Sequence, residues 1–132
     1  MDKRIVIESP LSGDFQHNYR YLLWCCRAVW EVDGLHAIAS HMINPWFMDD
    51  EDQVERNAGI GNPWVWMPDV AHVFFIDLGM SRGMNLALLR CRNRTAWSTN
   101  SLNHFYPDHW TAFQRGEWPP HTRGFEIAGE HD

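Results

Sequence analysis

Residues 70–84, VAHVFFIDLGMSRGM, decide the fold. Residues 70–76 are nearly continuous in apolar character, which is typical of a parallel strand covered on both faces. The chain then places Asp77 in a turn that contains Gly79 and continues as a helix, in which the apolar residues of one face are Met80, Met84, Leu88 and Cys91. A buried strand, a turn and an amphipathic helix together form one unit of a parallel α/β sheet.

Two similar units precede this one. Residues 4–8 are rich in β-branched side chains and predict a strand, after which the turn residues SPLSGD lead into a helix. Either Ser12 or Asp14 is expected to cap the beginning of that helix, and Gly34 is expected to end it. Residues 35–43 predict a second strand.

The second helix is expected to begin at the acidic residues 49–52, whose charge suits the positive end of the helix dipole. It is expected to break into two pieces at the residues that disfavour helix, Gly59, Gly61 and Pro63. Strand and helix thus alternate three times, which predicts an α/β fold of three layers around a small parallel sheet with right-handed crossovers.

The rest of the chain is less regular. Residues 95–99 predict a short final strand, and residues 107–116 predict a small helix with Pro107 in its first turn. We therefore divide the chain into an α/β domain, residues 1–94, and an irregular aromatic C-terminal extension, residues 95–132. The extension is expected to pack on the domain or on a neighbouring subunit.

Composition narrows the class of protein. The 132 residues suffice for one domain with a real core, and the net charge of −6 argues against a nucleic acid as partner. No apolar run approaches the roughly 20 residues that span a bilayer, and the N-terminus resembles no signal peptide. The chain has three cysteines and no CxxC pair, which argues against a disulfide framework. A reducing compartment, the cytoplasm, is therefore expected. The eight histidines include neither HxxxH nor HExxH, so no metal site is expected.

Two turns are candidates for a ligand site, because ligands of open parallel sheets bind beyond the carboxyl ends of the strands. Both turns are rich in small residues; the first contains Ser9, Pro10, Ser12 and Gly13, and the second contains Gly79, Ser81 and Gly83. Met84, which follows the second turn, is also a candidate ligand contact. Each turn precedes a helix, so backbone amides and the helix dipole could meet a phosphate or a ribose hydroxyl. Ordinary strand-to-helix turns also use small residues.

Three further side chains could contact a ligand. Asp77 follows a buried strand and could bind ribose hydroxyls, orient a base or cap the next helix. Glu55 could act as a nucleophile or as an acid or base, or it could belong to a solvated helix start. His41 ends the second predicted strand at the same edge, where it could touch the ligand.

Four motifs in this order, IVIESPLSGD, ASHMI, ERNAGI and DLGMSRGM, resemble the nucleoside 2-deoxyribosyltransferase-like superfamily, in particular its short bacterial and phage members. The similarity covers residues 4–91. It implies a flavodoxin-like fold, a homo-oligomer, and cleavage or exchange of the N-glycosidic bond of nucleosides or nucleotides, with no separate cofactor. It also implies that the turn at Ser9, Ser12 and Gly13 lies beside the sugar or phosphate, and that Ser81 and Gly83 form the second phosphate-facing turn.

The chain departs from that family at the catalytic glutamate, which the resemblance would place near the start of the helix after the second turn. Here Met84 and Asn85 stand in that neighbourhood, and neither carries a carboxylate. A rearranged site would need Glu55 or Asp77 to take over, with water attacking the sugar directly. The leading prediction is therefore a nucleotide-binding protein that resembles these enzymes, and the alternative is a non-catalytic protein that sequesters a nucleotide signal, possibly in a phage.

Overall fold

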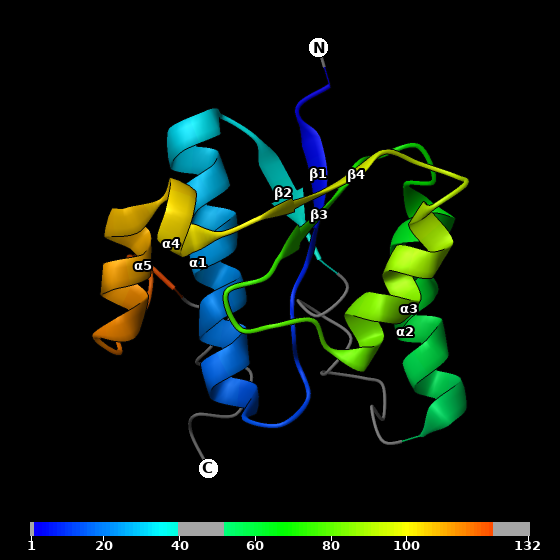
Figure 1. Cartoon of the computed structure of the whole chain (residues 1–132), viewed down its shortest axis with the longest axis horizontal. Coiled ribbons are helices and arrows are strands. Elements are labelled where there is room, and N and C mark those ends of the chain that lie inside the picture. Colours follow the sequence, from blue (N-terminus) through cyan, green and yellow to red (C-terminus); the bar gives the residue numbers. More distant parts are fainter. Residues whose placement is uncertain (1, 40–51, 123–132) are drawn as a thin grey trace.

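The structure, a computed structural model, describes residues 2–39 and 52–122, and only the backbone of residues 56–62. Strands and helices alternate along most of this length (Figure 1). Their bounds are β1 Arg4–Glu8, α1 Phe15–Asp33, β2 His36–Ile38, α2 Gln53–Trp66, β3 His72–Phe75, α3 Arg82–Cys91, β4 Trp97–Asn100, α4 Leu102–Phe105 and α5 Pro107–Gln114.

The four strands form one sheet in the order β2-β1-β3-β4, and every neighbouring pair is parallel. In the register, Val6 of β1 lies beside His72 of β3, which in turn lies beside Trp97 of β4. The predicted class is thereby confirmed: the protein has a small flavodoxin-like α/β fold.

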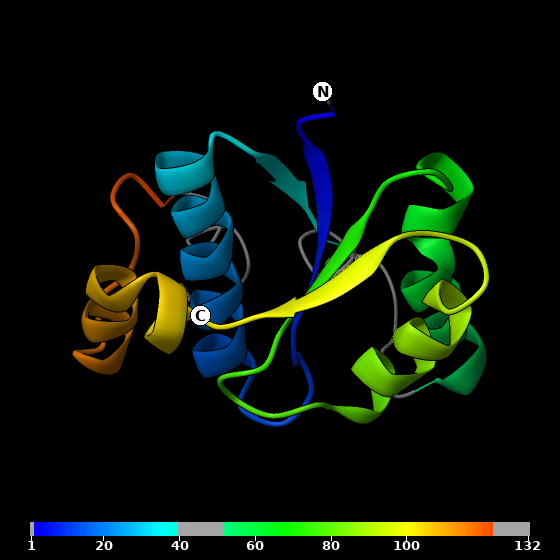
Figure 2. The same ribbon diagram turned by 45° about the horizontal axis from the view of Figure 1, so that its top comes forward.

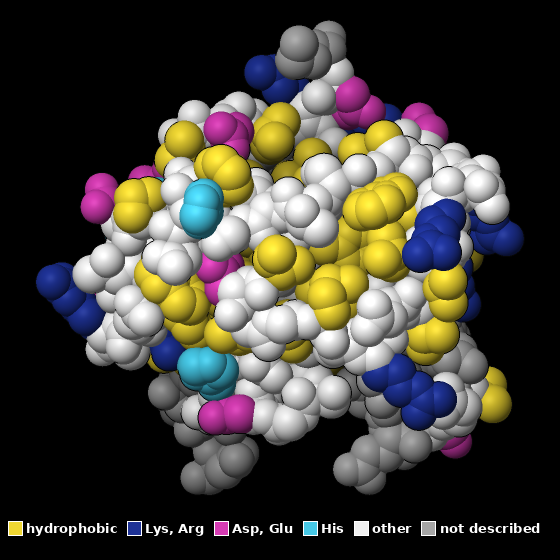
Figure 3. Space-filling model, viewed as in Figure 1, with side chains coloured by type: hydrophobic (Ala, Val, Ile, Leu, Met, Phe, Trp, Pro, Cys, Tyr) yellow, Lys and Arg dark blue, Asp and Glu magenta, His cyan; other side chains and the backbone are white. Residues whose placement is uncertain are grey.

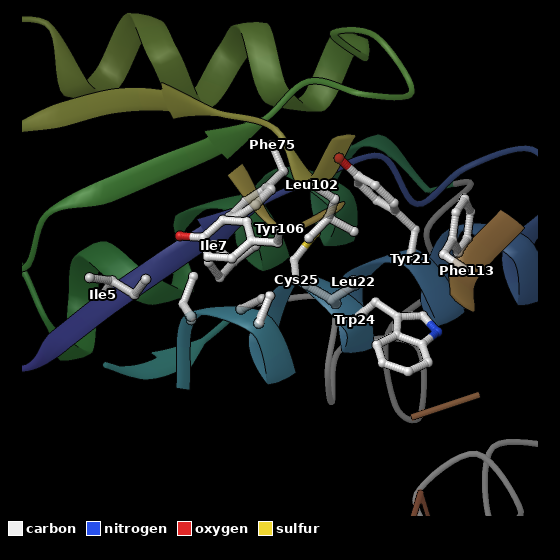
Figure 4. Close-up of a cluster of buried hydrophobic side chains, with 13 residues drawn as sticks. Ile5, Ile7, Tyr21, Leu22, Trp24, Cys25, Phe75, Leu102, Tyr106 and Phe113 are labelled. Carbon is white, nitrogen blue, oxygen red and sulfur yellow. The ribbon is translucent and has the colours of Figure 1, made fainter. Parts of the chain in front are cut away.

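Helices cover both faces of the sheet. Figures 1 and 2 show α1, α4 and α5 on one side and α2 and α3 on the other. The larger core cluster lies on the α1 side, where Ile7 of β1 and Phe75 of β3 meet α1 and the two short C-terminal helices (Figure 4). The smaller cluster joins Phe74 to Met84 and Cys91 of α3. Phe74 and Phe75 thus enter opposite layers, because successive side chains of a strand alternate between its faces.

Local signals fix the ends of the helices. Asp14 caps α1 by accepting a hydrogen bond from the backbone N–H of His17 at 3.1 Å. Gly34 ends that helix with a φ of 68°, a left-handed conformation that costs glycine little. Asp52 caps α2 and Ser81 caps α3 in the same way as Asp14.

The expected break in α2 is wrong. Residues 53–66 form one continuous helix that contains Pro63. The proline lies in the last turn, so it removes one hydrogen bond near the end of the helix instead of interrupting the middle. Beyond it, Trp64 packs against the sheet and stacks on His72, with ring centroids 4.4 Å apart. This contact with β3 stabilises the last turn of α2, and the sequence pattern does not predict it.

The segment assigned to the C-terminal extension contributes to the sheet and to the core. Its strand is β4, at residues 97–100 instead of 95–99, and it contains the short helix α4, which the sequence pattern does not predict. The helix expected at Pro107 is α5, which packs on α1, where Phe113 contacts Tyr21 with ring centroids 5.3 Å apart. The described part of the extension therefore packs on its own domain. Of the predicted second strand, only residues 36–38 form β2, and residues 40–43 lie outside the described residues.

Apolar side chains gather on the face crossed by β4 (Figure 3). Trp97 of β4 is 43% exposed, and Phe105 at the end of α4 is 64% exposed. Within the described parts of the chain, no helix is both long enough and apolar enough to cross a membrane.

Candidate functional site

The strand order places the two predicted turns next to each other. Strands β1 and β3 are neighbours, so the turns that follow them open at the same edge of the sheet. From that edge, α1 returns on one face and α3 on the other (Figure 2). A pair of adjacent strands whose helices leave to opposite faces is a topological switch point, where open α/β sheets bind their ligands in the crevice between the turns.

The turn between β1 and α1 is fixed by hydrogen bonds from α1. Ser9 and Pro10 are buried, whereas Ser12 and Gly13 are exposed to solvent. The side-chain amide of Asn18 on α1 donates hydrogen bonds to two carbonyl oxygens of the turn, at 3.1 and 3.0 Å. Asn18 thereby fixes the turn, and Ser12 and Gly13 remain accessible to a ligand.

The turn between β3 and α3 is a tight one. Gly79 has a φ of 88° and donates its backbone N–H to the carbonyl oxygen of Ile76 at 2.9 Å. Ser81 caps α3 by accepting the N–H of Met84, while the Met84 sulfur accepts the N–H of Ser81 at 3.4 Å. Gly83 is half-buried in the first turn of α3, and the Met84 side chain is buried in the core. Met84 can therefore offer a ligand only its backbone.

Asp77 acts as an internal anchor between this turn and α4. One carboxylate oxygen accepts the hydroxyl of Ser101 at 2.6 Å and the N–H of Asn103 at 3.0 Å. The other accepts the hydroxyl of Tyr21 at 2.5 Å and the N–H of Leu102 at 2.8 Å. A carboxylate has about four lone-pair sites, and four donors occupy them here. Asp77 thus caps α4, not the helix that directly follows it.

These contacts also shift the pKa values of Asp77 and Tyr21. Burial raises the pKa of the Asp77 carboxyl, but the hydrogen bonds from Ser101, Tyr21 and α4 outweigh it and bring the pKa below its ordinary value. The pKa of Tyr21 is raised, first by burial and also by the neighbouring Cys25 and Asp77. A carboxylate that stays ionised and fully hydrogen-bonded is a poor proton donor and a poor nucleophile.

The two remaining candidate side chains are Glu55 and His41. Glu55 lies in the first turn of α2, behind the cap at Asp52, and is partly exposed. His41 lies outside the described residues. The described candidates therefore form two groups: the adjacent turns at the switch point with Asp77, and Glu55 on α2.

A hollow of about 390 Å³ opens at the carboxyl ends of β3 and β4, beside the turn that carries Asp77. It is lined by Ile76, Asp77, Thr99, Asn100, Ser101, Asn103, His104, Phe105 and Trp110. Sequence reasoning missed it, because most of this wall belongs to the C-terminal extension. The sequence signal for it was the run of polar residues 98–101 at the end of the predicted final strand, with Asn103 and His104 shortly after it.

Sequence reasoning also missed a buried polar pair on the other face of the sheet. The Glu8 carboxylate lies 2.7 Å from Nδ1 of His72, whose side chain is fully buried. The ring of Trp64 stacks on His72 at 15° between planes, and neither His72 Nε2 nor Trp64 Nε1 has a hydrogen-bond partner among the described residues. The available signal was Glu8 at the end of the apolar run in RIVIE, and His72 as the one ionisable residue in HVFF.

Within residues 2–39 and 52–122, no group of three or more histidine, cysteine, aspartate or glutamate side chains could hold a metal ion. Comparison with curated proteins found no match, and comparison with solved structures found none either. A model of one protein family matches residues 3–98, from the residue before β1 into β4. The chain therefore belongs to the family described as a domain of unknown function, DUF7768.

Proposed function

We propose that this protein binds a nucleotide or nucleoside at the carboxyl edge of its sheet. The observation that carries the proposal is the switch point, because it brings two small-residue turns, at Ser12–Gly13 and at Gly79–Ser81, to adjacent strand ends. Backbone N–H groups at the beginning of α3 are suited to a phosphate. The resemblance to nucleoside 2-deoxyribosyltransferase-like proteins supports the same ligand class and stays a prediction.

Binding without glycosidic chemistry is the form of this function that the contacts favour. Both Asp77 carboxylate oxygens already accept hydrogen bonds from Tyr21, Ser101 and the first N–H groups of α4. The side chain of Met84, near the position where the resemblance implies a nucleophile, is buried. Glu55 is the remaining candidate for a reacting carboxylate. We therefore favour a protein that holds a nucleotide unchanged, as one that sequesters a nucleotide signal would, over a hydrolase or transferase of the same fold.

The proposed setting is the cytoplasm, because Cys25, Cys26 and Cys91 are all free thiols and a reducing compartment preserves that form. A homo-oligomer is a further prediction from the resemblance, and sedimentation of the purified chain would test it.

A chromatographic assay with a panel of ribo- and deoxynucleoside monophosphates tests the function. It measures free base in solution and, separately, nucleotide retained by the protein. We expect retention without base release. Ser12→Asp, which places a negative charge on the exposed turn, should reduce retention of monophosphates, whereas Asn93→Asp adds the same charge in the exposed turn after α3 and should not.

Two results would change the assignment. Release of base, abolished by Glu55→Gln, would make the protein a glycosidase with a relocated carboxylate. Failure to retain any nucleotide would refute the nucleotide site itself.

A further inference from the structure

The hollow beside Asp77 is built from two kinds of polar residue. The first kind is bonded within the protein: Asp77 holds α4, and Asn100 accepts the N–H of Ser101 at 2.7 Å and donates to the Tyr106 hydroxyl at 3.2 Å. These bonds fix the strand ends and the helix that form the wall. A wall that is held by its own hydrogen bonds is preorganised and does not have to be ordered by a ligand.

The second kind has no hydrogen bond from its side chain to any described residue. Thr99, Asn103, His104 and Trp110 all line the hollow in this condition. Together they offer both donors and acceptors. A small number of polar groups around one hollow is the arrangement that gives a binding site its specificity.

Exposed apolar surface lines the same space. Ile76 is 41% exposed and Phe105 is 64% exposed, although the neighbouring Leu102 and Tyr106 are buried. Trp110 adds an aromatic ring that lies 5.5 Å from Phe113 in centroid separation. Aromatic surface with polar edge groups around it matches a planar heterocycle, whose faces stack and whose edge forms hydrogen bonds.

We propose that this hollow binds the heterocyclic base of the nucleotide, and that Asn103, His104 and Phe105 determine which base is accepted. The inference rests on the proposed function and adds a specificity site to it. Ile76 and Asp77 line the hollow and directly precede the turn at Gly79 and Ser81, so the proposed base site and the proposed phosphate site share the carboxyl end of β3. The specificity residues lie beyond residue 98, where the family match ends. Members of the family with other C-terminal segments are then expected to bind other bases on the same phosphate-binding frame.

The test uses the full chain and compares ligands with and without a base. Isothermal titration measures the Kd of the nucleoside monophosphate that the panel retains best, and of ribose 5-phosphate. Asn103→Ala, His104→Ala and Phe105→Ala should each weaken monophosphate binding by roughly five- to 150-fold, the range that corresponds to about 1–3 kcal/mol for a stacked base. Ribose 5-phosphate should bind all three variants as it binds the wild type.

Matched controls are available on exposed sites away from the hollow. The control for Asn103 is Asn93→Ala, in the turn after α3, and the control for His104 is His36→Ala, at the start of β2. The control for Phe105 is Leu89→Ala, which removes an exposed apolar side chain from α3. They should leave both Kd values unchanged. Circular dichroism of all six variants identifies any that fails to fold, and Asn103→Asp, an isosteric change, then replaces Asn103→Ala.

The outcomes separate the two proposals. If the wild type binds monophosphates and the three variants at the hollow bind them equally well, the base site is refuted while the nucleotide-binding function stands. Equal losses of monophosphate and ribose 5-phosphate would also refute a base site. If the wild type binds neither ligand, the proposed function fails, and the base site fails with it.

Discussion

Replacing Asp77 with alanine should destabilise the protein strongly, because one carboxylate holds groups from two distant parts of the chain, Tyr21 of α1 and residues 101–103 at the beginning of α4. Tyr21 and Leu102 are both fully buried, so the hydroxyl of the first and the N–H of the second would lose a partner that water cannot easily replace. Each unsatisfied buried donor costs roughly 1–3 kcal/mol. Asn103 is exposed, and water can replace its lost bond. We expect Asp77→Ala to lower the free energy of unfolding by about 3 kcal/mol.

Urea unfolding at pH 7, followed by circular dichroism, measures this loss, and the slope of free energy against urea should not change. Asp69→Ala is the control. The Asp69 side chain is 73% exposed and pairs with Arg4 at 3.4 Å, so its removal should cost less than about 0.5 kcal/mol. A loss from Asp77→Ala as small as that of the control would refute the reasoning.

The same variant carries a pH dependence. The pKa of Asp77 in the folded protein lies below its ordinary value of 3.8, so the ionised carboxylate stabilises the fold above that value. This contribution is lost as the pH falls through the folded pKa. The difference in unfolding free energy between wild type and Asp77→Ala should therefore be constant near neutral pH and shrink below about pH 4. A difference that is unchanged at pH 3 would mean that the ionised form is not what holds α4.

Three further substitutions test other contacts. Gly34→Ala should cost about 1–2 kcal/mol, because alanine at a φ of 68° is strained although no atom lies within 4 Å of the added carbon, and a loss below 0.3 kcal/mol in urea unfolding would contradict this. Asn18→Ala leaves two carbonyl oxygens of the first turn without their donor and should lower the free energy of unfolding by about 1–3 kcal/mol, and a loss below about 0.3 kcal/mol in the same assay would contradict this. Glu8→Ala leaves buried His72 without its partner and should cost about 3 kcal/mol, whereas Glu8→Leu with His72→Phe should recover most of it in the same assay.

The parts of the fold that could be predicted from the sequence are those specified by nearby residues. The caps at Asp14 and Gly34 act within one helical turn, and the parallel sheet follows from the alternation of apolar strands with amphipathic helices. The prediction failed at Pro63, because stacking of Trp64 on His72 is a contact between distant segments. It failed at α4 for the same reason: a helix of four residues depends on Asp77, which lies 25 residues before Leu102.

The candidate site also has a part that the sequence predicts and a part that it does not. The two turns were predicted because the carboxyl ends of parallel strands meet at one edge, whatever the side chains are. The hollow was not predicted, because its wall requires β4 and α4 to be placed beside β3, and no local pattern after Asn100 indicates that the chain folds back on α1. The sequence allows Asp77 to bind a ligand or to cap a helix, and the donors that decide between these roles come from residues 21 and 101–103.

The anchor at Asp77 has a consequence for how the molecule opens. Tyr21 lies 56 residues from Asp77, and Leu102 lies 25 residues away on the other side. The amide hydrogen of Leu102 can meet solvent only when its bond to the Asp77 carboxylate breaks. That event also weakens the tie between α1 and the end of β3. The short helix is therefore expected to exchange its hydrogens together with the centre of the sheet, at a free energy close to that of global unfolding. In energetic terms, α4 is expected to belong to the same cooperative unit as β1 and β3, although it lies beyond the family match.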